Sequence, residues 1–311
     1  MSFSMSVRDE VSKIDGTRTE KLAELSAIIK NSGDFNNGIR ITIENNCVAR
    51  KIFKLFKEVY DINVGITVRR RYGFNNNLIY MLSVNSNCDE ILRDLSIIDE
   101  NGKYLDYPKE YLIGDTEDMR AYLRGLFMVS GSVNDPKTSR YHLEFLVDNG
   151  VYANFINDCL NSFNLNCKVI KREKNYMVYI KEAEKISDFL RLIKAYNGVM
   201  YFEDIRIYRD HKNMTNRLNN CEQANIDKIF LTASKQIMDI EKLQEYDLMD
   251  VIDDKLKEVI EYRLKYPESS LSELASIMSD ELGYHITKSG LNHRFRKIRE
   301  MVLKIGGDNN V

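Results

Sequence analysis

The sequence predicts an α+β protein in which two pseudo-symmetric αβαββα halves are followed by an all-α helix-turn-helix domain. Three observations indicate this class. An apolar helical pattern that ends in small residues occurs at Gly33 and again at Gly131, 98 residues later. A similar succession of strand and helix patterns follows each copy, as in an internal duplication with a pseudo-twofold axis. The last part of the chain has helical periodicity only.

The first half is expected over about residues 18–100. Apolar spacing and turn residues predict its elements in this order: a helix at 21–33, a strand at 38–43, a helix at 48–60, strands at 63–71 and 78–84, and a helix at 90–97. The second half, over about 117–205, repeats this order with a helix at 121–131, a strand at 141–147, a helix at 151–163, strands at 166–172 and 176–180, and a helix at 184–195. Together they predict a first domain over residues 1–208.

Residues 209–235 are polar and are expected to form a linker that passes into a helix at 224–240, before a C-terminal domain at 236–311. Three amphipathic helices are predicted there, at 253–265, 271–282 and 288–304. Pro267 stops the first of them, Ser270 is a suitable N-cap, and Gly283 suits a left-handed C-terminal turn. Their expected buried residues are Leu256, Val259, Ile260, Leu264, Leu271, Leu274, Ala275, Ile277, Met278, Leu291, Phe295, Ile298, Met301 and Val302.

Composition excludes several classes of function. The 311 residues are 43% apolar and contain 3 prolines, which favours folded domains over disordered linkers. Five scattered cysteines lack the spacing of a disulfide framework or a zinc site, and a reducing cytoplasm is expected. No apolar run approaches the ~20 residues of a membrane span. Phosphate-binding loops and nucleophile motifs are also absent from the sequence. From these observations together we expect no metal, no cofactor, no small-molecule substrate and no membrane partner.

Charge is segregated along the C-terminal part of the chain. Residues 286–305 contain six bases and one acid, a local charge of +5, whereas 236–282 contain thirteen acids and five bases, a local charge of −8. A basic helix after a turn is typical of a helix-turn-helix that enters the major groove of DNA, although Ser279 replaces the usual turn glycine and the turn at 280–286 is long. The predicted DNA-binding residues are Lys288, Ser289, Asn292, His293, Arg294, Arg296, Lys297, Arg299 and Lys304. The alternative is a protein-binding adaptor whose basic helix meets an acidic partner.

Two pairs of motifs resemble known families. LSAIIKNSG at 25–33 and LRGLFMVSG at 123–131 resemble the paired helices of LAGLIDADG homing endonucleases. The strings N-R-x-x-N-C-x-x-A-N-x-x-K at 216–228 and K-S-G-x-N-H-R-x-R-K at 288–297 are similar to those of the WhiA family of bacterial sporulation and cell-division transcription regulators, and the resemblance spans about residues 21–303.

The resemblance implies a LAGLIDADG-like domain without nuclease activity, fused to a helix-turn-helix that binds double-stranded promoter DNA. It implies a cytoplasmic, nucleoid-associated regulator of sporulation, cell division or chromosome segregation genes. RNA polymerase, a sigma factor or another regulator would be a further partner. The string at 216–228 suggests helix capping, domain docking or contact with a partner protein, and Cys221 within it is expected to be packed.

Ser32 and Ser130 stand where the endonucleases carry their catalytic acids. A hydroxyl is uncharged and holds Mg²⁺ poorly, so these are degenerate catalytic positions and no catalytic residue is predicted. An active homing endonuclease is the alternative, with Asp34 and Asp135 as substitutes at unequal distances from the helix ends.

Basic residues on one strand of each half could also contact DNA. They are Arg69, Arg70 and Arg71 in the first half, and Lys168, Lys171 and Arg172 in the second. The alternative is a sheet edge that charge protects from further strand pairing.

Overall fold

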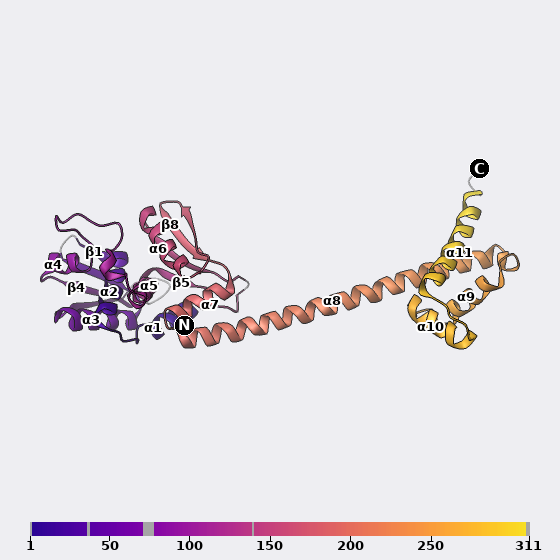
Figure 1. Cartoon of the computed structure of the whole chain (residues 1–311), viewed down its shortest axis with the longest axis horizontal. Coiled ribbons are helices and arrows are strands. Elements are labelled where there is room, and N and C mark those ends of the chain that lie inside the picture. The colour runs from indigo at the N-terminus through magenta and orange to yellow at the C-terminus, as the bar shows by residue number, and fades with distance from the viewer. Residues whose placement is uncertain (1, 36–37, 71–77, 139, 309–311) are drawn as a thin grey trace. The chain divides into compact units, whose positions relative to one another are not determined.

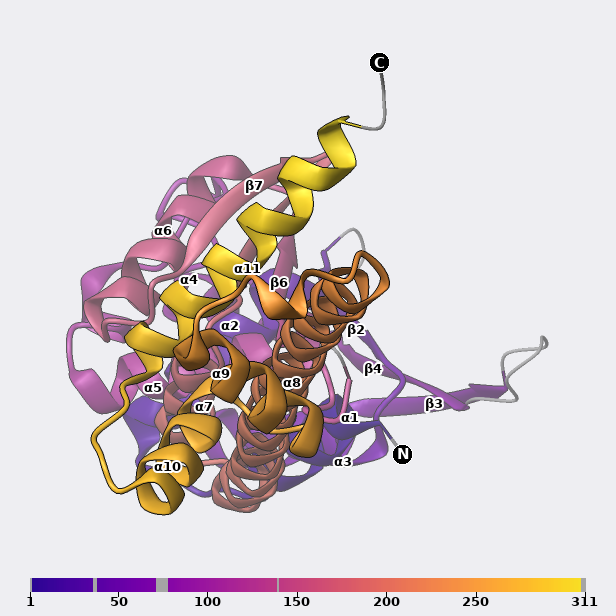
Figure 2. The same ribbon diagram turned by 90° about the vertical axis from the view of Figure 1, so that its right-hand side faces the viewer.

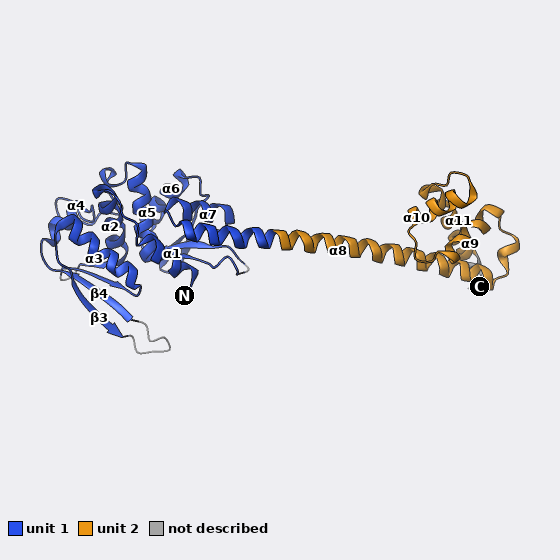
Figure 3. Ribbon diagram, turned by 90° about the horizontal axis from the view of Figure 1, so that it is seen from below, with its two compact units in different colours: residues 1–210 blue, residues 211–311 orange. Residues whose placement is uncertain are grey.

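A computed structural model of the chain describes residues 2–35, 38–70, 78–138 and 140–308. It divides into two compact units, Met1–Asp210 and His211–Val311 (Figure 3). Each unit has its own cluster of buried apolar side chains, so each can be described by itself. Among the described residues, no helix has the length and apolar character that crossing a membrane requires.

The first half of unit 1 contains three helices and four strands, several of which are labelled in Figure 1. In chain order its elements are α2 (Arg18–Ser32), β1 (Gly33–Asp34), β2 (Ile39–Ile43), α3 (Asn46–Tyr60), β3 (Gly65–Arg70), β4 (Leu78–Val84) and α4 (Cys88–Asp94). The strands form an antiparallel sheet in the order β1-β2-β4-β3. Thr17 and Glu20 begin α2 with a capping box, in which each side chain binds the other residue's backbone amide.

The second half repeats this arrangement. Its elements are α5 (Thr116–Ser130), β5 (Gly131–Val133), β6 (Leu143–Val147), α6 (Gly150–Ser162), β7 (Lys168–Arg172), β8 (Asn175–Ile180) and α7 (Ala183–Leu192), after a 3-10 turn at Glu110–Leu112. Its sheet order, β5-β6-β8-β7, matches that of the first half position by position. The α+β class and the duplicated organisation are therefore confirmed. Each half has one short strand more than predicted, β1 or β5, directly after its first helix.

The helix α1 (Phe3–Val11) was not predicted. Ser2 caps it, and Phe3, Val7 and Val11 are buried in the core of unit 1. These three residues recur every four positions, which is a helical period. The surrounding polar residues reduce the apolar contrast of the segment, which explains why the sequence pattern gave no prediction there.

α2 and α5 pack against each other along the centre of unit 1. Their backbones approach so closely that a Cβ at Gly125 would lie 2.4 Å from the carbonyl oxygen of Glu24. Beside this contact, the buried Arg124 guanidinium lies 3.3 Å from the Glu24 carboxylate, and Lys51 of α3 lies 3.5 Å from the same oxygen. Small residues and an internal ion pair therefore join the two halves.

The helix α8 (Tyr196–Glu245) contains all of residues 209–235, which we expected to begin as a linker. Cys221 on this helix is exposed, so the expectation that it is packed was wrong. Ala233, Ile240 and Leu243, further along α8, belong to the buried residues of unit 2.

Three more helices complete unit 2: α9 (Asp254–Lys265), α10 (Leu271–Leu282) and α11 (Lys288–Asp308), with a 3-10 turn at Leu248–Asp250 before them. The predicted helix-boundary residues are confirmed. Ser270 caps α10 in a capping box with Glu273, and Gly283 after α10 is left-handed with φ 74°. Of the predicted buried residues, Leu271, Ile277 and Met301 are half-buried and one, Leu264, is exposed. Leu264 is 41% exposed, whereas the neighbouring Arg263 is 1% exposed. Arg263 falls on the face of α9 that carries Leu256, Val259 and Ile260, since it follows them by seven, four and three positions.

Candidate nucleic-acid interface

The first four turns of α11 present one polar face. The Thr287 hydroxyl begins the helix by accepting a hydrogen bond from the Gly290 amide at 3.0 Å. Leu291, Phe295, Ile298 and Val302 are buried and fix the other side of the helix in the core of unit 2. Of the predicted DNA-binding residues, the exposed ones are Lys288, Ser289, Asn292, His293, Arg296, Lys297, Arg299 and Lys304, while Arg294 is half-buried.

Ser279 explains how the turn before α11 closes without the usual glycine. Its hydroxyl donates to the Ala275 carbonyl at 2.6 Å and accepts from the Ile286 amide at 2.9 Å. One side chain thus ties the last turn of α10 to the residue just before the N-cap of α11. The long turn is fixed at both ends, which positions α11 relative to α10.

Two of the basic residues on α11 have partners within the protein. Lys297 lies 3.2 Å from the Asp253 carboxylate, which also accepts the Leu256 amide at 2.9 Å to cap α9. The Leu256 amide and then Lys297 hold the pKa of Asp253 below its usual value. Arg296 lies 3.8 Å from Glu300 in an exposed pair that costs little to break. Lys297 therefore has a structural role in addition to its predicted contact with phosphate.

The ends of α2 and α5 carry hydroxyls that bond to their own helices. Ser32 Oγ donates to the Ile28 carbonyl at 2.6 Å, and Ser130 Oγ donates to the Leu126 carbonyl at 3.1 Å. Asp135 accepts from the Lys137 amide at 2.9 Å and from the Tyr201 hydroxyl at 3.3 Å. Within the described part of the chain, no group of three or more acidic, histidine or cysteine side chains is arranged to hold a metal ion.

A polar cavity of about 440 Å³ lies beside the end of α2, and sequence reasoning missed it. Lys30, Asn31 and Tyr152 are among its lining residues. Lys30 Nζ donates to the Leu105 carbonyl at 2.6 Å, and burial lowers the pKa of Lys30. Asn31 donates to the Tyr152 hydroxyl at 2.8 Å. The Asn31–Tyr152 bond joins α2 of the first half to α6 of the second half, and the Lys30 bond joins α2 to the segment between the halves, so both contacts have a structural explanation.

The predicted basic strand residues lie on β3 and β7, the equivalent edge strands of the two sheets. Figure 2 shows β3 and β4 running out side by side from the rest of unit 1. Neighbouring residues of a strand point to opposite faces. Ile66 and Val68 line a cavity with Phe53 of α3, so Arg70 shares the helix-facing side with them and Arg69 is on the open face. Arg71 lies outside the described residues.

The second sheet divides its basic residues in the same way. Val169 pairs with the buried Val178, which places Lys171, two residues on, on the helix-facing side. Lys168 and Arg172 therefore lie on the open face. In the first sheet the exposed Arg40 on β2 joins Arg69 on the open face, and sequence reasoning missed it. Its alternation with the buried Ile39 and Ile41 was the available signal.

The duplicated α+β unit, with serines at the ends of its two central helices, and the helix-turn-helix unit that follows it define a LAGLIDADG-like protein with a C-terminal helix-turn-helix. Comparison with known proteins identifies the family. Three family models match: the WhiA N-terminal LAGLIDADG-like domain at residues 18–98, the WhiA LAGLIDADG-like domain at 119–212, and the WhiA C-terminal HTH domain at 215–302. The chain belongs to the WhiA family.

Similar proteins match over the full length. A protein of Bacillus cytotoxicus named probable cell division protein WhiA is 39% identical over 310 residues, which cover 98% of this chain and 97% of that protein. One of Pediococcus pentosaceus with the same name is also 39% identical, over 98% of this chain and 99% of that protein. The crystal structure of full-length WhiA from Thermatoga maritima matches with a TM-score of 0.59 at 23% identity and covers 98% of this chain and 99% of that chain.

Proposed function

We propose that this protein is a sequence-specific DNA-binding transcription regulator without nuclease activity. The supporting observation is the polar face of α11. Asn292 and Arg296 are exposed, and they lie four residues apart on a helix whose opposite side is anchored by buried Leu291 and Phe295. Side chains at i and i+4 can reach neighbouring base edges together, and amide and guanidinium groups are the types that read adenine and guanine.

The regulated genes in this proposal are those of cell division, chromosome segregation or sporulation. The names of the curated relatives support the first of these processes. Double-stranded promoter DNA would be the ligand, which places the protein at the nucleoid. RNA polymerase, a sigma factor or another regulator would be its protein partner. A chromatin immunoprecipitation map at native expression level would identify the bound promoters.

The absence of nuclease activity can be tested directly. Ser32 and Ser130 replace the acids at the ends of α2 and α5, and a hydroxyl cannot assemble a divalent cation site unaided. We expect purified protein in excess, with Mg²⁺ or Mn²⁺, to leave supercoiled plasmid and promoter duplex intact over hours. Metal-dependent nicking that Asp34→Asn or Asp135→Asn abolishes would contradict the proposal.

The polar face is tested by comparing base-reading and phosphate-binding substitutions. Asn292→Ala and Arg296→Ala should each cost about 1 to 3 kcal/mol of binding free energy on promoter DNA and far less on random duplex. Lys304→Ala should weaken both duplexes equally and lower the slope of log affinity against log salt by about 0.9. Titrations of both duplexes at several salt concentrations measure these differences.

Equal losses on both duplexes for all three variants would make α11 an electrostatic anchor, and the base-reading assignment would be wrong. Unchanged binding in all three variants would favour the protein-binding adaptor.

A further inference from the structure

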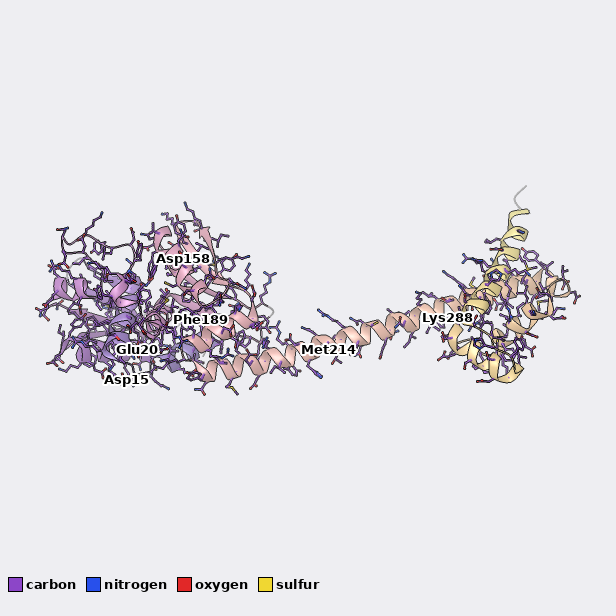
Figure 4. The ribbon with its side chains drawn as sticks, viewed as in Figure 1. Asp15, Glu20, Asp158, Phe189, Met214 and Lys288 are labelled. Carbon is purple, nitrogen blue, oxygen red and sulfur yellow. The ribbon has the colours of Figure 1, made fainter. Side chains whose placement is uncertain are left out.

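A cavity of about 910 Å³ lies in unit 2, where α8 meets the starts of α10 and α11. Asn225 and Lys228 line it from α8, Ser270 and Ser272 from the start of α10, and Lys288 and Ser289 from the start of α11. Lys288 is labelled in Figure 4, at the beginning of α11. Asn225 and Lys228 also belong to the distinctive string at 216–228, to which the proposed function gives no role.

Among the described residues, those that line this cavity carry positive charge and include no acid. Lys228, Arg263 and Lys288 contribute three cations, and the other lining residues are serine, threonine, asparagine or apolar. This composition contrasts with the surrounding sequence, because residues 236–282 contain thirteen acids and five bases. Like charges repel one another, so an anion bound among these three cations would reduce their mutual repulsion.

Arg263 is the most constrained of the three cations. It is 1% exposed, its guanidinium lies over the Phe295 ring at 5.5 Å, and its Nη1 donates to the carbonyls of Ser269 at 2.7 Å and Tyr266 at 3.2 Å. Its Nε is buried without an acceptor, and among the described residues no carboxylate forms an ion pair with it. Burial lowers the pKa of Arg263. A buried charge without a counter-ion is costly, and a bound anion would supply one.

Two helix N-termini add hydrogen-bond donors. The capping box of α10 occupies the amides of Ser270 and Glu273, which leaves those of Leu271 and Ser272 without an acceptor inside the helix. Thr287 occupies the Gly290 amide of α11, which leaves those of Lys288 and Ser289. Both helices have the positive ends of their dipoles here, partly offset in α10 by the Glu273 carboxylate, and Ser272 and Ser289 line the same cavity.

We propose that this cavity is a phosphate-binding site. Arg263 provides a fixed positive charge at its wall, Lys228 and Lys288 close over the anion from two helices, and the free amides of α10 and α11 donate to its oxygens. A phosphodiester of duplex DNA and a free phosphate-bearing molecule share this chemistry. The first source rests on the proposed function, whereas the second does not.

The site is tested with inorganic phosphate as the probe. Calorimetric titration of the full chain at constant ionic strength should detect saturable binding. Lys228→Gln should weaken that binding about tenfold or more, since it removes a charged donor. Lys242→Gln is the matched control, because Lys242 is an exposed lysine of the same helix outside the cavity, and it should leave binding unchanged. Because Lys228 is exposed, the substitution should leave the helix content and melting temperature unaltered.

Duplex DNA then distinguishes the two sources. If the phosphate is that of DNA, Lys228→Gln should reduce the slope of log affinity against log salt by about 0.9 relative to Lys242→Gln, and inorganic phosphate should compete with duplex. If it is a free ligand, phosphate should bind equally well with duplex present and the slope should not change. The proposal is overturned if wild-type protein binds no phosphate and the slopes agree, or if both variants lose phosphate binding equally. A chain that binds phosphate but no duplex would contradict only the proposed function.

Discussion

Glycine at position 125 allows the backbones of α2 and α5 to touch. We expect Gly125→Ala to lower the free energy of unfolding of unit 1 by about 1 to 3 kcal/mol, because its Cβ would lie 2.4 Å from the Glu24 carbonyl oxygen and the two helices would have to separate. Gly290→Ala is the control in unit 2, where the added Cβ would meet the Thr287 hydroxyl at 3.3 Å. Urea denaturation measures both. A neutral Gly125→Ala would show that the helix pair can separate freely.

The cysteines differ in reactivity according to burial. Cys159 and Cys167 are buried, and burial raises the pKa of each thiol to about 12, whereas Cys221 is exposed on α8. We therefore expect alkylation of the native protein at pH 8 to modify Cys221 first, and Cys159 and Cys167 only after unfolding, since the thiolate is the reactive form. Mass spectrometry of partially alkylated protein, with Cys221→Ser as control, identifies the sites. Early modification of Cys159 would show that α6 opens readily.

At the scale of elements, long segments with clear apolar periodicity could be predicted from the sequence. α3, α9 and α10 lie within a few residues of their predicted ranges. The short strands β1 and β5 could not be predicted, because a segment of two or three residues is too short to show an alternating apolar pattern. They are strands because they pair with β2 and β6, which is a tertiary contact.

Two buried arginines mark the limit of prediction from periodicity. The apolar pattern predicted that Leu264 is buried, but Arg263 is buried instead. A pattern that places only apolar residues in the core does not consider that the aliphatic part of an arginine side chain can also be buried there. Arg263 is held by the carbonyls of Tyr266 and Ser269 and by the Phe295 ring. Phe295 follows Arg263 by 32 positions and Glu24 precedes Arg124 by 100, so these two contacts cannot be predicted from the period of one helix. In the candidate interface, by contrast, the exposed face of α11 followed from its sequence.

The ion pair between α2 and α5 should respond differently to single and double substitution. Arg124→Met should cost about 3 to 5 kcal/mol of unfolding free energy, because it leaves the buried Glu24 carboxylate with Lys51 alone. Adding Glu24→Gln should recover part of that loss, because it removes the buried carboxylate that lost its guanidinium, while Lys51 keeps its hydrogen bond to the Ile14 carbonyl. A double-mutant cycle from urea denaturation gives the coupling free energy. Strictly additive losses would mean that the two charges do not depend on each other.

At the scale of the whole molecule, each unit has its own core. The residues of α8 are divided between the units, because unit 1 ends at Asp210 and unit 2 begins at His211. The segment 209–235 was expected to begin as a linker and to pass into a helix at 224, whereas α8 contains all of it. The polar composition of 209–223 is compatible with a linker or with an exposed helix, so the sequence alone did not distinguish them. Ala233, near the end of the segment, is 2% exposed and packs in unit 2. The C-terminal unit must therefore be taken from residue 211, and a fragment that begins at 236 loses Ala233 from the core and Lys228 from the cavity.

Fragments that follow these limits should separate the two roles of the molecule. We expect residues 211–311 to unfold cooperatively and to bind promoter duplex with the sequence preference of the full chain, because the core of unit 2 and the polar face of α11 are both complete within it. Residues 1–210 should also fold, and should bind duplex weakly and without preference through Arg69, Lys168 and Arg172 on the open sheet faces. Residues 236–311 should be less stable than 211–311. Circular dichroism during thermal unfolding, together with titrations on promoter and random duplex, measures each expectation. If 1–210 alone bound promoter DNA specifically, base reading would belong to the sheets, and α11 would have to be reassigned to protein binding.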